Sequence, residues 1–299
     1  MMTVKFYGVR GSYPVSGKDT AFYGGNTTCV SFTKEVDGKI YRLIIDSGTG
    51  IIQLGKEIIQ NFFAKKEDLN INLFFTHLHP DHSQGFPFFG PNYFKNCLIN
   101  LYGMSALGSD IEQVLAAQMT PPNFPIEYRS MKSNRNHTCL TDGDVVNIDA
   151  NYQALSPVIF KVKVMQAYAP SHPQQGALYY RVYDNETGKS VACIWDNESK
   201  VGGDKAVIKF SEGADVMIHD TQYTTEEYTN SNMIVQGFGH STYEMAIDNA
   251  NQAGVKRLYA IHYNPAHTDD KLRQIQDQFL RNSSLPQILL AQERMEIEV

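Results

Sequence analysis

A short segment of the chain concentrates the residue types that bind metal ions. The sequence HLHPDH, which begins at His77, follows an apolar run at 71–76 (INLFFT) that predicts a buried strand. On an extended backbone, His77 and His79 point the same way and suit one ion. Asp81 and His82 come after the turn and suit a second ion. Three imidazoles and a carboxylate within six residues predict a metal site with room for two ions.

Further ligand candidates stand where predicted strands end. His172, Asp196 and His262 each follow an apolar segment of strand-forming residues. Because parallel strands end at the same edge of a sheet, we expect these loops to meet. The expected set places His77, His79 and His172 on one ion and Asp81, His82 and His262 on the other, with Asp196 between them and one carboxylate oxygen on each.

The elements that must position these residues alternate along the chain. Strands are predicted at 4–9, 28–33, 41–45, 158–164, 177–183, 190–194, 216–219 and 257–261. Helices are predicted from 51 to 62, near 109–119, after Ser241 and after Thr268. Ser241 and Glu244 have the spacing of a capping box. No repeat or long linker interrupts the pattern, so we expect one α/β domain over residues 1–299.

Composition indicates an intracellular protein whose overall charge does not attract nucleic acid. The chain has 299 residues, which is ample for a large core. A formal net charge of −6 and a pI of 5.8 argue against a global basic surface. The four cysteines lie far apart without a CxxC pair, which argues against a cysteine zinc cluster and fits a reducing compartment. With no signal-like start and no long apolar stretch, we expect a cytoplasmic protein without a membrane partner.

The order of the candidate ligands resembles the metallo-β-lactamase fold superfamily over nearly the whole chain. The HxHxDH signature of that superfamily corresponds to residues 77–82, and its later histidine, bridging aspartate and last histidine correspond to His172, Asp196 and His262. The resemblance implies an αββα sandwich, in which two mixed sheets pack face to face with helices outside. It also implies two divalent metal ions, for which we expect zinc first, with manganese or iron as alternatives.

Further motifs resemble the phosphodiesterase branch, which includes ribonuclease Z and cyclic-nucleotide phosphodiesterases. Residues 176–182 (GALYYRV) look like its GYR strand, and residues 218–221 (IHDT) are similar to its HEAT-like strand end. Residues 239–242 (GHST) resemble its HST motif, whose histidine lies near the substrate phosphate. Asp46, in a DSG turn, is similar to the supporting aspartate of the superfamily. It is expected to hold a ligand histidine through the second ring nitrogen.

One departure from that branch concerns RNA. Many bacterial ribonuclease Z enzymes carry a tRNA-gripping arm between the third-histidine motif and the bridging aspartate. The interval from His172 to Asp196 is too short for an arm, so we expect no long nucleic acid as partner. The expanded segment is instead 83–139, which we expect to be an insert beside the site. Its aromatic residues at 86–94 either wall the pocket and stack a nucleobase, pack beneath a helix, or form a homodimer contact.

These observations predict a dinuclear metal-dependent phosphodiesterase for a small cyclic or linear substrate. Two divalent ions lower the pKa of a bridging water, and the resulting hydroxide attacks phosphorus. Asp81 is expected to orient that water as well as to bind metal. His240 is expected to protonate the leaving oxygen or to bind the phosphate. It stands just ahead of a predicted helix N-terminus, where backbone N–H groups, with Ser241 and Thr242, favour an anion.

Other functions use the same ligand set. A thioester or lactone hydrolase of this fold would keep all seven ligands, but the GYR and HST resemblances favour phosphodiester chemistry. An RNA-processing nuclease is a second alternative. A metal-sensing scaffold without catalysis would be expected to have lost ligands, and every ligand position here is filled. A redox enzyme with non-haem iron is also compatible, because oxygen and imidazole ligands accept iron.

Overall fold

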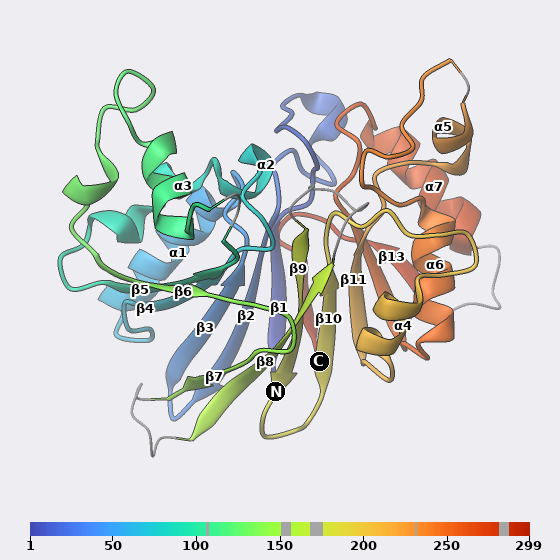
Figure 1. The fold of residues 1–299 in the computed structure, drawn as a ribbon. Coiled ribbons are helices and arrows are strands. Elements are labelled where there is room, and N and C mark those ends of the chain that lie inside the picture. The colour runs from blue at the N-terminus through green and yellow to red at the C-terminus, as the bar shows by residue number, and fades with distance from the viewer. Residues whose placement is uncertain (106–107, 151–156, 168–175, 231, 281–286) are drawn as a thin grey trace.

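A computed structural model describes residues 1–105, 108–150, 157–167, 176–230, 232–280 and 287–299. Its strands form two sheets of seven that face each other, with helices on both outer faces (Figure 1). In order across the first sheet, the strands are β14 (Glu296–Glu298), β1 (Thr3–Gly8), β2 (Cys29–Val36), β3 (Lys39–Ile45), β4 (Asn70–Phe74), β5 (Leu98–Gly103) and β6 (Asn134–Cys139). In the second sheet they are β13 (Gln287–Leu290), β12 (Arg257–Ile261), β11 (Val216–Asp220), β10 (Ser190–Ile194), β9 (Ala177–Asp184), β8 (Val158–Ala167) and β7 (Val145–Asp149).

Both sheets are mixed, and the helices cover their outer faces. The pairs from β3 to β6 and from β10 to β13 are parallel, whereas the remaining neighbours are antiparallel. The helices are α1 (Ile51–Phe63), α2 (Pro80–Ser83), α3 (Ile111–Gln118), α4 (Lys205–Ser211), α5 (Thr225–Thr229), α6 (Tyr243–Gln252) and α7 (Asp269–Leu280). In Figure 1, α1 and α3 flank the first sheet, and α4, α6 and α7 flank the second. The αββα sandwich predicted from the sequence is confirmed.

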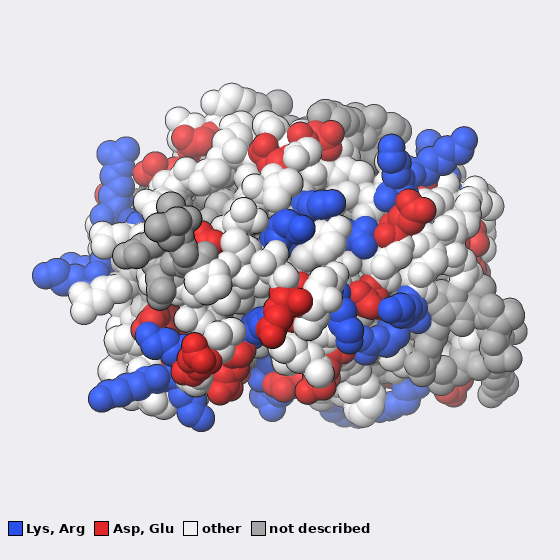
Figure 2. All heavy atoms as spheres, turned by 90° about the horizontal axis from the view of Figure 1, so that it is seen from below, with Lys and Arg blue, Asp and Glu red and all other residues white. Residues whose placement is uncertain are grey.

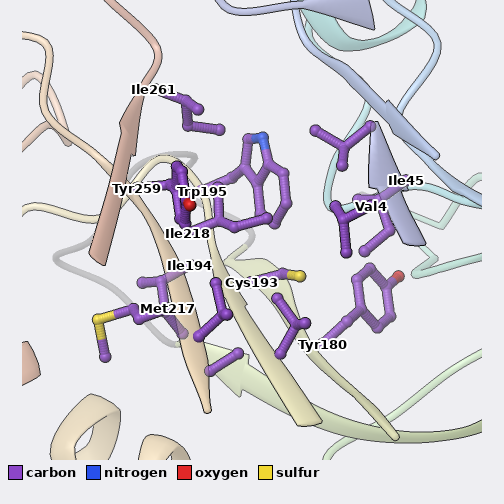
Figure 3. Packing of buried hydrophobic residues seen from close by; sticks show 14 of the residues in the cluster. Val4, Ile45, Tyr180, Cys193, Ile194, Trp195, Met217, Ile218, Tyr259 and Ile261 are labelled. Carbon is purple, nitrogen blue, oxygen red and sulfur yellow. The ribbon is translucent and has the colours of Figure 1, made fainter. Parts of the chain in front are cut away.

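The main core fills the space between the two sheets. Trp195 is fully buried there, among side chains from both sheets such as Val4 and Ile45 of the first and Ile218 of the second (Figure 3). Tyr180, on β9, donates its hydroxyl hydrogen to the backbone oxygen of Phe75 at 2.6 Å and so ties the sheets together. Truncating a buried aromatic side chain as large as Trp195 to alanine destabilises a fold by about 3–5 kcal/mol. The position of the sheets, and of everything at their edges, therefore depends on this core.

Sharp turns follow three strands at the same end of the sandwich. Asp46 directly follows β3, His262 directly follows β12, and Asp196 stands two residues past β10. All three have a positive φ, at 61°, 62° and 44° respectively. Residues other than glycine rarely adopt this left-handed conformation, and they do so mainly where surrounding contacts over-determine it. These turns direct three polar side chains toward one region at the edge of the sandwich.

Some elements differ from the sequence-based expectation. The expanded segment 83–139 contributes β5 and β6 to the first sheet, together with α3 and short 3-10 turns. Helix α6 is capped by Thr242, whose hydroxyl accepts from the Met245 amide, so the capping box expected at Ser241 is wrong. Thr268 does accept from the Lys271 amide, as expected of a cap. No helix in the described ranges is long and apolar enough to cross a bilayer.

Candidate metal centre and active site

The candidate ligands gather at one edge of the sandwich, where both sheets contribute. His77 and His79 follow β4, and α2 carries Asp81 and His82 (Figure 1). Pro80 occupies the first turn of α2, where its missing N–H is tolerated and its fixed φ favours a helix start. This short helix turns the chain so that the two later ligands face the same region as the two histidines before it. From the second sheet come Asp196 and His262, both buried.

The predicted ligands form two groups of donor atoms that share Asp196, and a third group joins Asp196 and His262 to Asp220 and His240. In the first group, Asp196 Oδ2 lies 3.5 Å from His77 Nε2, and His79 belongs to the same group. Asp196 Oδ1 lies 3.1 Å from His82 Nε2 and 3.2 Å from His262 Nε2. Asp81 Oδ2 completes the second group, at 3.3 Å from His82 Nε2 and 3.2 Å from His262 Nε2. His172, which the sequence analysis assigned to the first group, lies outside the described residues.

The spacing and chemistry of these donors suit divalent cations. Ligands about 2.0–2.1 Å from a tetrahedral zinc ion lie roughly 3.3 Å from one another, which is the spacing seen here. Two imidazole nitrogens, on His82 and His262, face each other at 3.2 Å in a buried setting. His82 directs Nδ1 to a carboxylate of Asp46, so the lone pair of a neutral ring is on Nε2. Nitrogen and carboxylate lone pairs that converge in this way repel one another unless a cation lies between them.

The electrostatics of the buried cluster agree with that requirement. Burial raises the pKa of Asp196, but His262, His82 and His77 outweigh it and hold the carboxyl well below its usual range. Burial lowers the pKa of His82, but the effect of Asp196, Asp81 and Asp46 is larger and raises this pKa well above the ordinary value. The pKa of His262 rises to about 9 because the nearby carboxylates overcome its burial. The carboxylates thus demand positive charge, which bound divalent ions supply without protonating the rings.

Asp46 supports His82 from behind. Its Oδ2 lies 2.7 Å from His82 Nδ1 and accepts from the Thr76 hydroxyl at 2.8 Å, while Oδ1 accepts from the Thr76 amide at 2.8 Å. Asp46 is fully buried, so this network is shielded from water. A carboxylate in this position fixes the tautomer and the orientation of the imidazole whose other nitrogen faces the metal site.

His240 stands beside the second group of donors, held by an aspartate that the sequence analysis did not single out. Asp220 Oδ2 lies 2.7 Å from His240 Nδ1, and Asp220 Oδ1 lies 3.9 Å from His262 Nδ1. The His240 and His262 rings stack with centroids 4.9 Å apart. Asp220 is the last residue of β11, and that position at the end of a predicted strand is the signal that could have identified it.

Ser241 and Thr242, expected to contact substrate, use their hydroxyls elsewhere. Ser241 Oγ donates to the Asn197 backbone oxygen and accepts from the Ser199 amide. The Thr242 hydroxyl caps α6. Both residues are buried. These contacts assign the two hydroxyls to internal hydrogen bonds, so any contribution to anion binding would come from the backbone N–H groups at this helix start.

The first loop of the chain also reaches the site, which the sequence analysis did not foresee. The Ser12 amide donates to Asp81 Oδ2 at 2.8 Å. Gly11 packs so closely that a Cβ there would lie 2.3 Å from His262 Nδ1 and 2.4 Å from Gln222 Oε1. Only glycine fits against this histidine without displacing it. The loop therefore limits where two of the candidate ligands can move.

The aromatic segment at 86–94 divides between the interior and the surface. Phe86 and Phe89 are fully buried in a second core, between the first sheet and its helices. Phe88 is 57% exposed and meets Phe124 edge-on, with centroids 5.4 Å apart. Packing beneath a helix thus accounts for the two buried rings, and Phe88 is the ring of this group that solvent reaches most.

Comparisons with known proteins agree with this architecture. Residues 41–263 match a family described as the beta-lactamase superfamily domain. Proteins named Ribonuclease Z are among the similar sequences. The one from Picrophilus torridus is 24% identical, over 66% of this chain and 70% of its own length. The one from Haloarcula marismortui is 23% identical, over 100% of this chain and 97% of its own length.

Two solved structures share the fold over nearly the whole of both chains. The metallo-beta-lactamase fold protein YhfI from Bacillus subtilis has a TM-score of 0.65 and 17% identity, covering 100% of this chain and 99% of its own. Unliganded yeast PDE1 has a TM-score of 0.64 and 12% identity, covering 100% and 99%. At these identities, the likeness concerns the fold. Together with the family match, it confirms the resemblance stated from the sequence.

Proposed function

The chain belongs to the beta-lactamase superfamily domain family, and on this premise we propose that it is a dinuclear metal-dependent phosphodiesterase acting on a small cyclic or linear phosphodiester. The observation that carries the proposal is the position of Asp196. Its two carboxylate oxygens face two separate groups of histidine nitrogens. A carboxylate placed in this way supports two ions close together, an arrangement suited to displacement at phosphorus.

Each ion would have its own ligands. His77, His79 and Oδ2 of Asp196 would hold one, with His172 completing the set, and Asp81, His82, His262 and Oδ1 of Asp196 would hold the other. When bound, the two ions supply a water of lowered pKa and positive charge for the phosphoryl oxygens. Nitrogen and oxygen ligands at tetrahedral spacing favour zinc, and manganese or iron are the alternatives.

Asp81 serves both metal binding and the orientation of the attacking water. Its Oδ2 faces His82 and His262 and also accepts from the Ser12 amide. That backbone hydrogen bond restrains the carboxylate oxygen that faces the two histidines. A group held in this way adds little reorganisation when the reaction occurs.

His240 acts on the oxygen that leaves phosphorus, or on a phosphoryl oxygen. Asp220 accepts from Nδ1, which fixes the ring and leaves Nε2 as the nitrogen that meets the substrate. His240 is 6% exposed, so it reaches only a group that enters the site. His240 would then donate a proton from Nε2 to the leaving alkoxide and so act as a general acid.

Two features bear on substrate size. The first is charge: a formal net charge of −6 favours a small phosphodiester, because long nucleic acids depend on many cationic contacts to phosphate. On the face opposite α2, Lys and Arg are interspersed with Asp and Glu (Figure 2). The similarity to proteins named Ribonuclease Z favours RNA processing as the second candidate.

Hydrolysis of bis(p-nitrophenyl) phosphate by protein loaded with zinc or manganese tests the proposal. The matched control is His79→Ala, which removes one proposed ligand from a half-buried position. We expect turnover by the native protein and its loss in the variant, at unchanged thermal stability of the metal-free forms. Absence of turnover at full metal occupancy would contradict the proposal and would direct the search to thioesters and lactones. Cleavage of a precursor tRNA, without cleavage of small phosphodiesters, would favour the second candidate.

A further inference from the structure

Glu198 stands two residues after Asp196 and ties two loops of the site together. Its Oε1 accepts from the Gly237 amide at 2.7 Å and from the Tyr228 hydroxyl at 2.8 Å, and its Oε2 accepts from the Gly239 amide at 2.9 Å. The side chain is half-buried, and no Lys or Arg among the described residues pairs with it. A carboxylate that accepts backbone N–H groups forms stronger hydrogen bonds than a neutral acceptor does.

The turn that Glu198 holds leads directly into His240. Gly237 and Gly239 both have positive φ, at 86° and 88°, so their amides can point toward a single carboxylate. Gly239 is the residue before His240 and is buried. The backbone of His240 is therefore fixed by Glu198, whereas its ring is fixed by Asp220.

A second connection lies on the other side of His240. Ser241 Oγ donates to the Asn197 backbone oxygen and accepts from the Ser199 amide. The loop that follows Asp196 thus holds the residues on both sides of His240, at Gly239 and at Ser241. Asp196 and His240 also share a group of potential donor atoms with Asp220 and His262, all within 4.8 Å of one another, so the alignment of His240 bears directly on the metal site.

We propose that Glu198 is a positioning residue that sets the place of His240 relative to Asp196. The expected effect of Glu198 on the reaction rate rests on the proposed function, whereas its expected effect on the turn does not. Without the carboxylate, the two glycine amides turn to water and the turn relaxes, because glycine has the most backbone freedom to regain. Asp196, although two residues from Glu198, lies outside the turn at Gly237 and Gly239 that relaxes, and the other described donors lie on separate segments. We therefore expect His240 to lose its alignment while the metal donors stay in place.

The kinetic test compares Glu198→Ala with a matched control, Tyr228→Phe. The control removes one hydrogen bond to Oε1 but keeps both glycine amides on the carboxylate. The substrate is the dinucleotide UpU, whose leaving alkoxide needs a proton. We expect Glu198→Ala to lower kcat about tenfold, with KM and bound metal within about twofold of native, and Tyr228→Phe to keep kcat within about twofold. Glu198→Gln, which keeps one acceptor oxygen, should restore part of the loss. Native kcat in Glu198→Ala, or a loss that follows loss of metal, would overturn the proposal.

A double-mutant cycle and an activity-free measurement complete the test. In a His240→Ala background, Glu198→Ala should lower kcat no further, since both act through one group. An equal further loss would overturn the proposal. Hydrogen exchange of the peptide 232–241 needs no substrate and should be faster in Glu198→Ala than in the native protein and in Tyr228→Phe. If the native protein hydrolyses no phosphodiester, the proposed function fails, and the exchange rates alone decide whether Glu198 holds the turn.

Discussion

Asp220 Oδ2 and His240 Nδ1 lie 2.7 Å apart, although the two residues are 20 positions apart in the chain. The pair joins the end of β11 to the loop that precedes α6. The Tyr223 amide, three residues past Asp220, also donates to the Ser241 backbone oxygen at 3.2 Å, so the backbone supports the same approach. The orientation of His240 is therefore set by contacts, its own and those of its immediate neighbours, with residues that are distant in the sequence.

Asp220→Asn should weaken catalysis most for substrates with poor leaving groups. The amide keeps the size of the carboxylate but removes the charge that supports a protonated imidazole. We expect kcat to fall about a hundredfold for UpU and much less for bis(p-nitrophenyl) phosphate, whose leaving phenolate needs no proton. Steady-state rates on both substrates provide the measurement. An equal loss on both would show that His240 does not act as a proton donor.

Asp46→Asn should weaken metal binding without unfolding the protein. The carboxylate accepts from His82 Nδ1 and from Thr76, and the asparagine keeps only one acceptor oxygen. Loss of such a supporting carboxylate lowers metal affinity about 10- to 100-fold. Competition with a chromophoric zinc chelator measures the change, with thermal unfolding of the metal-free forms as control. Unchanged affinity would mean that Asp46 only stabilises the turn.

Asp196→Ala should abolish binding of both ions together. The carboxylate lies between the two groups of donors, at 3.5 Å from His77 Nε2 and 3.2 Å from His262 Nε2. Its removal deprives each ion of one ligand and also removes the negative charge that lets two cations approach. The metal content of the purified variant, measured by inductively coupled plasma mass spectrometry, should fall to near zero. Full occupancy of one site would exclude Asp196 as the bridge.

Glu227→Gln should remove part of the stability that the protein has above acidic pH. Burial raises the pKa of Glu227, but hydrogen bonds from His267 Nε2, at 2.8 Å, and from Thr224 outweigh it and lower the pKa to about 2. Because the folded pKa is lowered, the stabilisation is present above the ordinary value of 4.5 and is lost as pH falls toward 2.

The size of that effect is limited by solvent, since the Glu227 side chain is 34% exposed. We expect the variant to lose about 1–2 kcal/mol of unfolding free energy at neutral pH, with the difference shrinking steadily in acid. Urea unfolding over a range of pH measures both curves. Parallel curves for the native protein and the variant would show that the ionised carboxylate contributes nothing.

The histidine cluster was predictable because its members are neighbours in the sequence and follow a recognisable strand. Asp196 and His262 could be selected because each ends a predicted strand. Asp220 ends one as well, but its partner, His240, comes into reach only through the pairing of β11 with β12 and the loop that follows. The use of Ser241 as a link between loops, rather than as a helix cap, likewise depends on Asn197 and Ser199, which are distant in sequence.

Parts of the first sheet were not predictable from side-chain patterns. Strand β6 reads NRNHTC and shows no alternation of apolar and polar residues. It joins the sheet through its backbone and through an amide ladder, in which Asn136 Nδ2 donates to Asn100 Oδ1 at 2.9 Å and Asn100 Nδ2 donates to Asn72 Oδ1 at 3.2 Å. Such an edge strand depends on the register of its neighbour, which no local pattern reveals.

The expectation of a single domain stays a prediction.

His82 and His262 face each other at 3.2 Å across a separation of 180 residues. During synthesis, the ribosome therefore releases the first histidine cluster long before the chain that supplies the opposite donors. At a typical elongation rate of about 5–20 residues per second, that interval lasts roughly 10–40 seconds. Through that time the nascent chain lacks at least one of the donors that face the first cluster, first Asp196 and then His262. We therefore expect any ion bound early to be held more weakly than in the finished protein, where the full set of donors is in place.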